Sequence, residues 1–393
     1  MENNLKDTSL EELLTRGVEE IIDYSNLEKK LKSGKKLRVK LGIDPTSSNI
    51  HLGRSIPLLK LRDFQKLGHQ IIFVVGDFTA LIGDTSDKES ERPMLSEEAV
   101  KNNLKNYIKQ VAKIIDIEKT EIIYNSKALK KLGYLEIGQQ ADAFSLNEFI
   151  SRENISKRLK AGKRVSLREL LYPLMQGYDS VMIKADVEIG GSDQRFNILA
   201  GRDLQRLYSQ EPQDIITNPL IEGLDGRKMS SSFGNSVNLF DPPREMFGKI
   251  MSLKDEFIIK YFVLLTRVDM KLIKGYEKEL KAGANPRDHK LKLAHEIVRF
   301  YHSEKKADSE KEYFIKTFSK KETPNDIKKI SPDDYSLISI LVNNSLVVSN
   351  SEAKRVIEQG GVKINGLVVK DVKQIVLPGS IIQKGKINFL EIL

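Results

Sequence analysis

The sequence predicts an α/β protein whose first half is a parallel sheet with helices on both faces. Short β-branched runs alternate with amphipathic stretches between residues 37 and 220, and this alternation is typical of successive β-α-β units. In such a fold, ligands bind beyond the carboxyl ends of the strands. The expected strands are 37–43, 70–75, 121–124 and 215–220, and the expected helices are 55–67, 96–115 and 194–208.

The pattern changes after Asp241, where the chain becomes helical and rich in lysine. Pro242 and Pro243 are a helix start signal, and the run 285–288 (Asn-Pro-Arg-Asp) begins a further helix that extends to Tyr301. Residues 322–334 contain two prolines and read as a linker. Residues 335–393 return to a small α+β pattern.

Composition limits the class of protein. A chain of 393 residues with 40% hydrophobic and 30% charged residues is globular and holds two or three domains. No apolar run approaches the roughly 20 residues that span a bilayer, and residues 1–16 lack the apolar core of a signal peptide. Cysteine is absent, which excludes disulfides and thiolate metal sites and fits a cytoplasmic protein. The net charge of +9 is compatible with a polyanionic partner.

Two short segments far apart in the chain indicate nucleotide chemistry. Residues 44–54 follow an expected strand, and residues 226–232 form a polar loop bounded by glycine. His51 can donate a hydrogen bond to a phosphoryl oxygen, Gly53 lets a flat base lie on the backbone, and Lys228 supplies charge for a departing pyrophosphate. No GxxxxGK[ST] run is present, so a P-loop ATPase has no support.

A third segment places polar groups on one side of a helix. Tyr172, Gln176 and Asp179 are spaced i, i+4 and i+7 and therefore share a face. Spacing alone leaves open an exposed polar face or a binding surface. The run Gly190–Gln194 (Gly-Gly-Ser-Asp-Gln) follows closely.

These segments together resemble the class I aminoacyl-tRNA synthetases. His51-Leu52-Gly53-Arg54 resembles their "HIGH" motif and Lys228-Met229-Ser230-Ser231-Ser232 their "KMSKS" loop, while residues 172–179, 76–88 and 285–302 resemble the bacterial tyrosyl-tRNA synthetases. The resemblance implies a Rossmann-like parallel sheet, an α-helical domain and a small α+β domain. The implied bounds are a catalytic domain at 1–235 with a dimerisation insertion near 110–165, an anticodon-binding domain at 236–322, a linker at 323–334, and an RNA-binding domain at 335–393.

The family implies that tyrosine and ATP form tyrosyl-adenylate and that tyrosine then passes to the 3′ end of tRNA(Tyr). Mg²⁺ would accompany ATP, with no dedicated metal site and no tightly bound cofactor. The implied catalytic residues are His51, Arg54, Lys228 and Ser231. The implied ATP-binding residues are Asp44, Thr46, His51, Gly53, Arg54, Asp193, Lys228, Met229, Ser230, Ser231 and Ser232. The implied tyrosine-binding residues are Asp44, Asp84, Tyr172, Gln176, Asp179 and Gln194, with Asp179 accepting the phenolic hydroxyl.

The sequence departs from the family pattern at three positions. Lys40, beside Leu41, stands where many members place a second phenol-binding tyrosine, so phenol recognition is expected to depend more on Asp179. Arg54 replaces a histidine and Ser231 replaces a lysine. These two changes keep a non-catalytic RNA-binding paralogue as an alternative, and the shared architecture keeps tryptophanyl-tRNA synthetase as another.

The C-terminal segment resembles the small S-four-like RNA-binding domain. Its run 349–357 leads into a Gly-Gly turn and an Asn-Gly hairpin at residues 359–366. Lys354, Arg355 and Lys363 are the expected tRNA-binding residues, because a cluster of cations binds phosphates. The expected partners are therefore tRNA(Tyr), tyrosine, ATP and a second copy of the chain, without a membrane.

Overall fold

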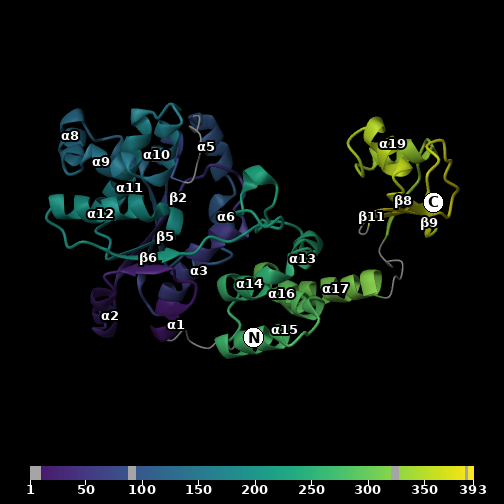
Figure 1. Ribbon diagram of the computed structural model, residues 1–393, viewed down its shortest axis with the longest axis horizontal. Helices are drawn as coiled ribbons and strands as arrows, with labels where there is room; N and C mark the ends of the chain where they lie inside the picture. Colours follow the sequence, from purple (N-terminus) through teal and green to yellow (C-terminus); the bar gives the residue numbers. More distant parts are fainter. Residues whose placement is uncertain (1–9, 87–93, 320–326, 386–387) are drawn as a thin grey trace. The chain divides into compact units, whose positions relative to one another are not determined.

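The computed structural model describes residues 10–86, 94–319, 327–385 and 388–393. The chain divides after Ala307 into two compact units, each considered by itself (Figure 1). Most of the charged segment 1–16, the end of 76–88, the first residues of the expected linker 323–334 and part of 335–393 lie outside the described residues.

The first unit contains a six-stranded sheet in the order β1-β6-β5-β2-β3-β4. The strands from β2 to β6 pair in parallel, as predicted, and β1 pairs antiparallel with β6 at the edge. Chain order reverses between β2 and β5, which is where ligands bind in open α/β sheets. The strands are β1 (Glu20–Ile22), β2 (Arg38–Ile43), β3 (Gln70–Val75), β4 (Thr120–Tyr124), β5 (Val187–Gly191) and β6 (Asp214–Asn218).

Four of these strands agree with the predicted ones to within a few residues, whereas β1 and β5 were not predicted. β1 has three residues, and β5 ends in two glycines, so neither carries the β-branched run that marks a strand. β5 is nevertheless central, because it pairs with both β2 and β6.

Helices cover both faces of this sheet (Figure 1). The predicted helices 55–67 and 194–208 are α3 (Leu52–Lys66) and α12 (Arg195–Leu207). α12 packs on the long helix α11 (Leu167–Ile183), which begins with a capping box of Ser166 and Glu169. The remaining helices of this region are α1 (Leu10–Thr15), α2 (Tyr24–Lys32), α4 (Thr79–Ile82), α7 (Ser126–Leu129), α8 (Tyr134–Asp142), α9 (Leu146–Ile150) and α10 (Glu153–Lys160).

The single helix predicted at 96–115 is wrong, because the structure has α5 (Glu97–Leu104) and α6 (Tyr107–Val111). The helix is interrupted between Leu104 and Tyr107, and the buried side chain of Gln110 on α6 contacts the loop before α3. Gln110 Oε1 accepts from Ile50 N at 2.7 Å, and Gln110 Nε2 donates to Ser48 O at 2.8 Å. Satisfying these loop groups is a tertiary requirement that helix periodicity does not reveal.

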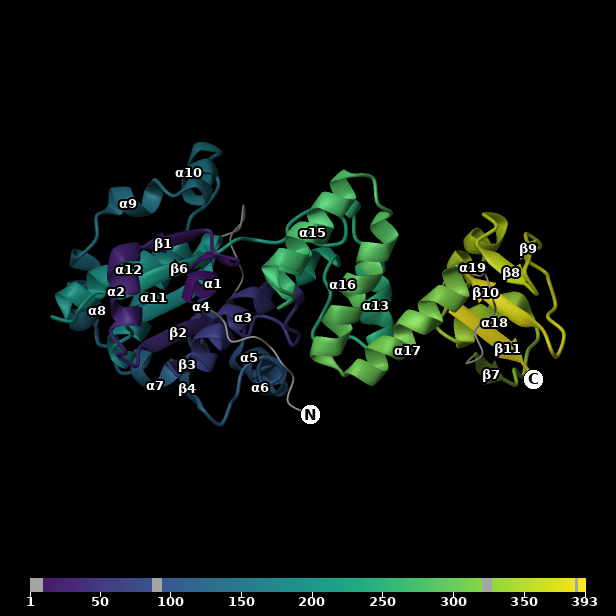
Figure 2. The same ribbon diagram turned by 90° about the horizontal axis from the view of Figure 1, so that it is seen from below.

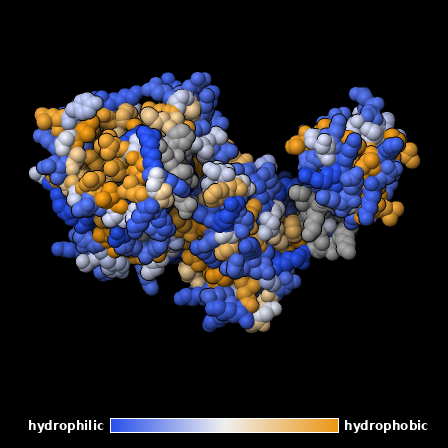
Figure 3. Space-filling view, turned by 45° about the horizontal axis from the view of Figure 1, so that its top comes forward, coloured by the Kyte–Doolittle hydropathy of each residue, from blue (hydrophilic) through white to orange (hydrophobic). Residues whose placement is uncertain are grey.

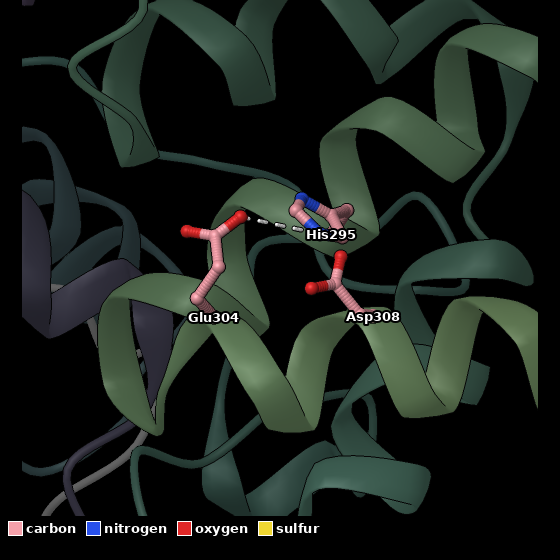
Figure 4. Close-up of side chains that lie close together, drawn as sticks. All are labelled: His295, Glu304 and Asp308. Carbon is pink, nitrogen blue, oxygen red and sulfur yellow. Dashed lines mark ion pairs between the residues drawn. The ribbon is translucent and has the colours of Figure 1, made fainter.

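The predicted helical region after residue 241 is confirmed (Figure 2). Proline begins α13 and α16, and the Asn285 side chain caps α16 by accepting from Arg287 N at 3.1 Å. His295 of α16 faces Glu304 of α17 with a separation of 3.7 Å between Nε2 and Oε1 (Figure 4). The helices are α13 (Pro243–Met251), α14 (Ile258–Leu265), α15 (Met270–Lys281), α16 (Pro286–Tyr301) and α17 (Glu304–Phe314).

The second unit holds a five-stranded sheet in the order β7-β11-β10-β8-β9, packed against α18 (Leu337–Asn343) and α19 (Asn350–Glu358). Its strands are β7 (Lys328–Ile330), β8 (Val362–Ile364), β9 (Leu367–Val369), β10 (Ile381–Lys384) and β11 (Asn388–Ile392). β7 lies in the segment expected to be a linker, yet it pairs in parallel with β11. This edge strand was not predicted because it is short, contains two lysines and has prolines on both sides, so its sequence shows no β-propensity.

No helix in the described parts of either unit is long and apolar enough to span a bilayer.

Candidate active site

A cavity of about 390 Å³ lies beyond the carboxyl ends of β2 and β5. Its volume falls within the range of small-molecule sites. Every residue expected to bind ATP or tyrosine contributes to its lining, although the residues come from segments far apart in sequence. These are Asp44, Thr46, His51, Gly53, Arg54, Asp84, Tyr172, Gln176, Asp179, Asp193, Gln194, Lys228, Met229, Ser230, Ser231 and Ser232.

The two nucleotide segments pack directly on one another. His51 forms the N-cap of α3, and Gly53 N donates to Met229 Sδ at 3.2 Å. Leu52 N donates to Val237 O at 2.8 Å, just beyond the second segment. The start of α3 and the loop that carries Lys228 therefore form one wall of the cavity.

The loop itself is held by Asn235, which sequence reasoning missed. Asn235 Oδ1 accepts from Ser230 N at 2.9 Å, and Asn235 Nδ2 donates to Lys228 O at 3.1 Å and to Asp225 Oδ1 at 2.7 Å. The hydrogen bond from Asn235, with the salt bridge to Arg227, lowers the pKa of Asp225 to about 2. Asparagine often bonds to nearby backbone groups in loops, but its sequence position alone did not distinguish Asn235 from other polar loop residues.

His51 is buried, and its Nδ1 has no hydrogen-bond partner in the described structure. Burial, aided by the charges of Arg54 and Lys228, lowers the pKa of His51 to about 3. The imidazole is therefore neutral at pH 7, with one N–H to donate.

Arg54 is anchored beside this histidine. Its Nη2 donates to Thr46 Oγ1 at 2.9 Å, and its Nη1 lies 3.3 Å from the hydroxyl oxygen of the buried Tyr107. A guanidinium offers several N–H groups, so these contacts leave donors for a ligand. Arg54 and Lys228 make this part of the cavity cationic, and the neutral His51 adds an N–H donor.

The opposite part of the cavity is acidic and is organised around Asp44. Thr79 Oγ1 donates to Asp44 Oδ1 at 2.7 Å, and the Tyr172 hydroxyl donates to Asp44 Oδ2 at 2.8 Å. Burial raises the pKa of Asp44 to about 6. A Cβ on Gly76 would lie 1.9 Å from Asp44 Oδ1, so only glycine permits this arrangement. Thr79 and Gly76 were not predicted as site residues.

Asp84 and Gln194 form a second polar group on this side. Gln194 Nε2 donates to Asp84 Oδ2 at 2.7 Å and to Ser86 Oγ at 2.9 Å. Asn197 Nδ2 donates to the carboxamide oxygen of Gln194 at 3.2 Å, and Ser86 N donates to Asp84 Oδ1 at 2.9 Å. Both acceptors lie near Tyr172, whose pKa rises through burial and the charges of Asp44 and Asp84. Acceptors of this kind match a primary ammonium group.

Asp179 lies on the same face of α11 as Tyr172 and Gln176, as predicted. Asn125 Nδ2 donates to Asp179 Oδ2 at 3.2 Å, while the buried Asp179 Oδ1 has no partner in the described structure. Burial raises the pKa of Asp179 to about 7, although Lys40 and Asn125 oppose the rise. Asn125, which follows β4 directly, is a further site residue that sequence reasoning missed.

Comparison with known proteins agrees with this geometry. Residues 32–319 match the family described as tRNA synthetases class I (W and Y), and residues 337–382 match the S4 domain. The tyrosine–tRNA ligase of Thermotoga maritima is 43% identical over 97% of this chain and 96% of its own length. That of Aquifex aeolicus is 46% identical over 91% of each.

The chain belongs to the class I tyrosyl-tRNA synthetases.

Solved structures support the fold of this family. The tyrosyl-tRNA synthetase of Archaeoglobus fulgidus, complexed with L-tyrosine, has a TM-score of 0.61 at 24% identity and covers 76% of this chain and 98% of its own. A C-terminally truncated mitochondrial enzyme from Aspergillus nidulans has a TM-score of 0.66 at 21% identity, covering 78% and 93%. The predicted synthetase fold with a C-terminal S4 domain is confirmed.

The expected tRNA-binding residues of this synthetase lie in the S4 domain. Lys354 and Arg355 are exposed on α19, and Lys363 is half-buried on β8. Val362 and Ile364, which flank Lys363, pack in the core with α18 and α19. Side chains alternate along a strand, so Lys363 points to the sheet face that these helices do not cover. Lys363 and the two cations of α19 therefore lie on different sides of the sheet, so the three cations do not form one compact face.

Proposed function

We propose that the chain is a tyrosine–tRNA ligase whose cavity binds tyrosine at its acidic part and ATP at its cationic part. The observation that carries this assignment is the unpartnered, buried Oδ1 of Asp179 at the acidic end. A buried acceptor without a donor costs free energy, and a phenolic hydroxyl offsets that cost. Phenylalanine lacks the hydroxyl and is rejected, and the tyrosyl-tRNA synthetases are themselves the standard example of this form of discrimination.

The ammonium group of tyrosine then lies among acceptors already in place. Gln176, Asp84 and the phenol oxygen of Tyr172 line this part of the cavity, and Asp44 adds a carboxylate that Thr79 and Tyr172 hold in position. Fixing both ends of the substrate directs its carboxylate toward the cationic part, which brings the reacting groups together.

In the first step, a tyrosine carboxylate oxygen attacks the α-phosphorus of ATP, and the bond from that phosphorus to pyrophosphate breaks. His51, Arg54 and Lys228 stabilise the negative charge that develops on the phosphoryl oxygens, with neutral His51 as an N–H donor. Asp193 accepts hydrogen bonds from the ribose. In the second step, a ribose hydroxyl at the 3′ end of tRNA attacks the tyrosyl carbonyl, and AMP leaves.

Mg²⁺ would enter with ATP. Two carboxylates of the cavity already have partners, as Asp44 accepts from Thr79 and Tyr172 and Asp193 pairs with Lys228. The donor set therefore fits an ion coordinated mainly by ATP phosphates and water, as is usual for Mg²⁺. Charging of tRNA also implies a cytoplasmic location, where translation uses the product.

We also propose that two copies associate through the region that includes the insertion 110–165. Figure 3 shows hydrophobic side chains gathered over the part of the first unit that carries α8 to α12. Contiguous apolar surface of this kind is typical of protein interfaces. The most exposed large apolar residues there are Tyr134, Leu135, Leu146 and Leu167. Sedimentation of wild type and Leu135→Asp tests this, since a wild-type monomer would contradict it.

Amino-acid-dependent exchange of pyrophosphate into ATP tests the main assignment. We expect exchange with tyrosine and not with tryptophan or phenylalanine. Exchange with tryptophan would instead indicate a tryptophanyl-tRNA synthetase, and no exchange with any amino acid would indicate a non-catalytic RNA-binding paralogue.

A further inference from the structure

A fully buried ion pair lies behind the tyrosine end of the cavity. Lys40 of β2 and Glu188 of β5 are register neighbours on adjacent parallel strands, with 2.9 Å between Nζ and Oε1 and side-chain exposures of 0% and 1%. Removing two charges from water costs several kcal/mol per ion, and apolar residues of the same size are often no less stable. The pair therefore needs an explanation beyond stability.

Both members of the pair hold α11 at the residues that face tyrosine. Lys40 Nζ donates to Gln176 O at 2.9 Å and to Ser180 Oγ at 2.7 Å. Glu188 accepts from Gln176 Nε2 at 3.3 Å and from Ser180 Oγ at 2.9 Å. Asp179 lies next to Ser180, so the pair fixes the helix turn that carries both Gln176 and Asp179.

The contact with Glu188 also orients the Gln176 amide. Its NH₂ group donates to Glu188 behind the helix, which leaves the carbonyl oxygen as the group available to the cavity. An acceptor is what a substrate ammonium requires. Gln213 Nε2 donates to the other carboxylate oxygen of Glu188 at 2.5 Å, so Glu188 cannot readily turn away.

We propose that the Lys40–Glu188 pair is a positioning device that sets affinity for tyrosine through Gln176 and Asp179, without touching the substrate. The proposal deepens the proposed function and rests on it. Lys40 thus has a role at the position where the family resemblance implied a phenol-binding tyrosine. It acts through α11 and does not itself line the cavity.

The charges of the pair act on Asp179 in opposite directions. The groups that act on Asp179 are Lys40 on β2, Glu188 on β5, Asp44 after β2, Asn125 after β4 and Tyr172 on α11. Burial raises the pKa of Asp179 to about 7, Lys40 lowers it, and Glu188 and Asp44 raise it, with the effect of Lys40 larger than that of Glu188. Tyrosine binding needs the carboxylate as an acceptor, so binding weakens as pH falls through this pKa.

The test uses the full-length chain with Lys40→Met and Glu188→Gln. Tyrosine affinity is measured directly by calorimetry from pH 6 to 9, and KM for tyrosine and for ATP by pyrophosphate exchange. We expect each variant to weaken tyrosine binding about tenfold, the cost of about one misplaced hydrogen bond to a charged group, with KM for ATP nearly unchanged. In the plot of tyrosine affinity against pH, the loss of affinity at low pH should move to higher pH in Lys40→Met and to lower pH in Glu188→Gln. We call this part of the profile the acid limb.

Opposite shifts of the acid limb are the decisive readout, because general structural damage does not produce them. If Lys40→Met does not fold, the neutral double variant Lys40→Met/Glu188→Gln replaces it, and its limb should still move upward since the effect of Lys40 is the larger. Asp63→Asn is the matched control. It breaks the buried pair of Arg267 and Asp63, whose side-chain exposures are 12% and 3%, and should lower stability without changing tyrosine affinity.

Two outcomes overturn the proposal in distinguishable ways. Variants that bind tyrosine as wild type does, with an unmoved pH profile, would show that the pair only supports the fold. A wild-type chain that binds no tyrosine would overturn the proposed function and this inference together.

Discussion

Lys228 Nζ lies 2.9 Å from Asp193 Oδ2 across the cavity. One of these residues is the cation expected to stabilise pyrophosphate, and the other is the acceptor expected to bind ribose. Because they pair with each other, ATP must exchange their contact for its own. Both side chains are partly exposed, and a salt bridge of this kind contributes only about 0–1 kcal/mol. Exchanging this salt bridge for contacts with ATP therefore costs little free energy.

Lys228→Met should slow tyrosyl-adenylate formation by about 100- to 1000-fold, because it removes one donor to the charge that develops on the leaving group. Tyrosine affinity should change little, since the acidic part of the cavity is intact. Rapid-quench experiments measure the rate of adenylate formation, and calorimetry measures the affinity for tyrosine. Lys271→Met, on an exposed lysine of α15 outside the cavity, is the control. A variant with a normal adenylation rate would remove Lys228 from the chemistry.

Asp179→Asn should raise stability at high pH while it lowers activity with tyrosine. The pKa of Asp179 in the folded chain is about 7 because of burial, above the unfolded value of about 3.9. Its contribution to stability is therefore fully present below the unfolded pKa and is lost as pH rises through 7. Asparagine does not ionise, so the variant should gain melting temperature relative to wild type from pH 5 to pH 8. A difference in melting temperature that is constant across this range would show that Asp179 titrates normally.

The same variant tests substrate discrimination. Asp179→Asn should lose most of its kcat/KM for tyrosine and little of its trace activity with phenylalanine, because only tyrosine offers a hydroxyl to Oδ1. Pyrophosphate exchange with each amino acid measures both. Equal losses of kcat/KM for tyrosine and phenylalanine would mean that Asp179 has only a structural role.

The S4 domain should bind tRNA electrostatically. Lys354→Ala/Arg355→Ala in the full chain should reduce the salt dependence of tRNA affinity, lowering the slope of log K against log salt by about 0.7–0.9 for each phosphate that these cations neutralise. Pyrophosphate exchange should be unaffected. The control is Lys29→Ala/Lys32→Ala, which removes two charges from α2 of the first unit. An equal slope in both variants would place the tRNA-binding surface elsewhere.

The sequence predicted the parallel sheet because long β-branched runs such as 70–75 carry their own signal. It did not predict β5, whose glycines serve close packing: a Cβ on Gly190 would lie 2.5 Å from an Ile198 methyl. The resemblance to the synthetase family supplied most of the residues expected to touch ligands, and all of the residues expected to bind ATP or tyrosine line the cavity.

The residues that hold those groups were not predicted. Thr79 and Asn125 act through hydrogen bonds between distant segments, and Asn235 acts within its own loop. No local pattern distinguishes such residues from ordinary polar loop residues. Lys40 was noticed only as a departure from the family, because its partner Glu188 lies on the strand that was missed.

The last prediction concerns the two departures in the nucleotide motifs. Thr46 fixes Arg54 at 2.9 Å beside His51, and Ser231 lines the same cavity. Ser231 removes a positive charge that the family usually has, and Arg54 adds one from the other motif. An arginine carries its charge at any physiological pH and can clamp phosphate oxygens, which the usual neutral histidine cannot do. The two substitutions should therefore compensate each other.

Arg54→His should slow adenylate formation about 10- to 1000-fold, as expected when one well-placed donor is removed. Ser231→Lys should restore part of that rate, with a coupling energy of about 1 kcal/mol or more. Rapid-quench rates for wild type, the two single variants and the double variant complete the cycle. The Thr46→Val variant supplies a further check, because it frees Arg54 without removing its charge and should have a smaller effect than Arg54→His. Strictly additive single effects would disprove compensation, and an unchanged rate in Arg54→His would leave Arg54 as an ordinary residue of α3.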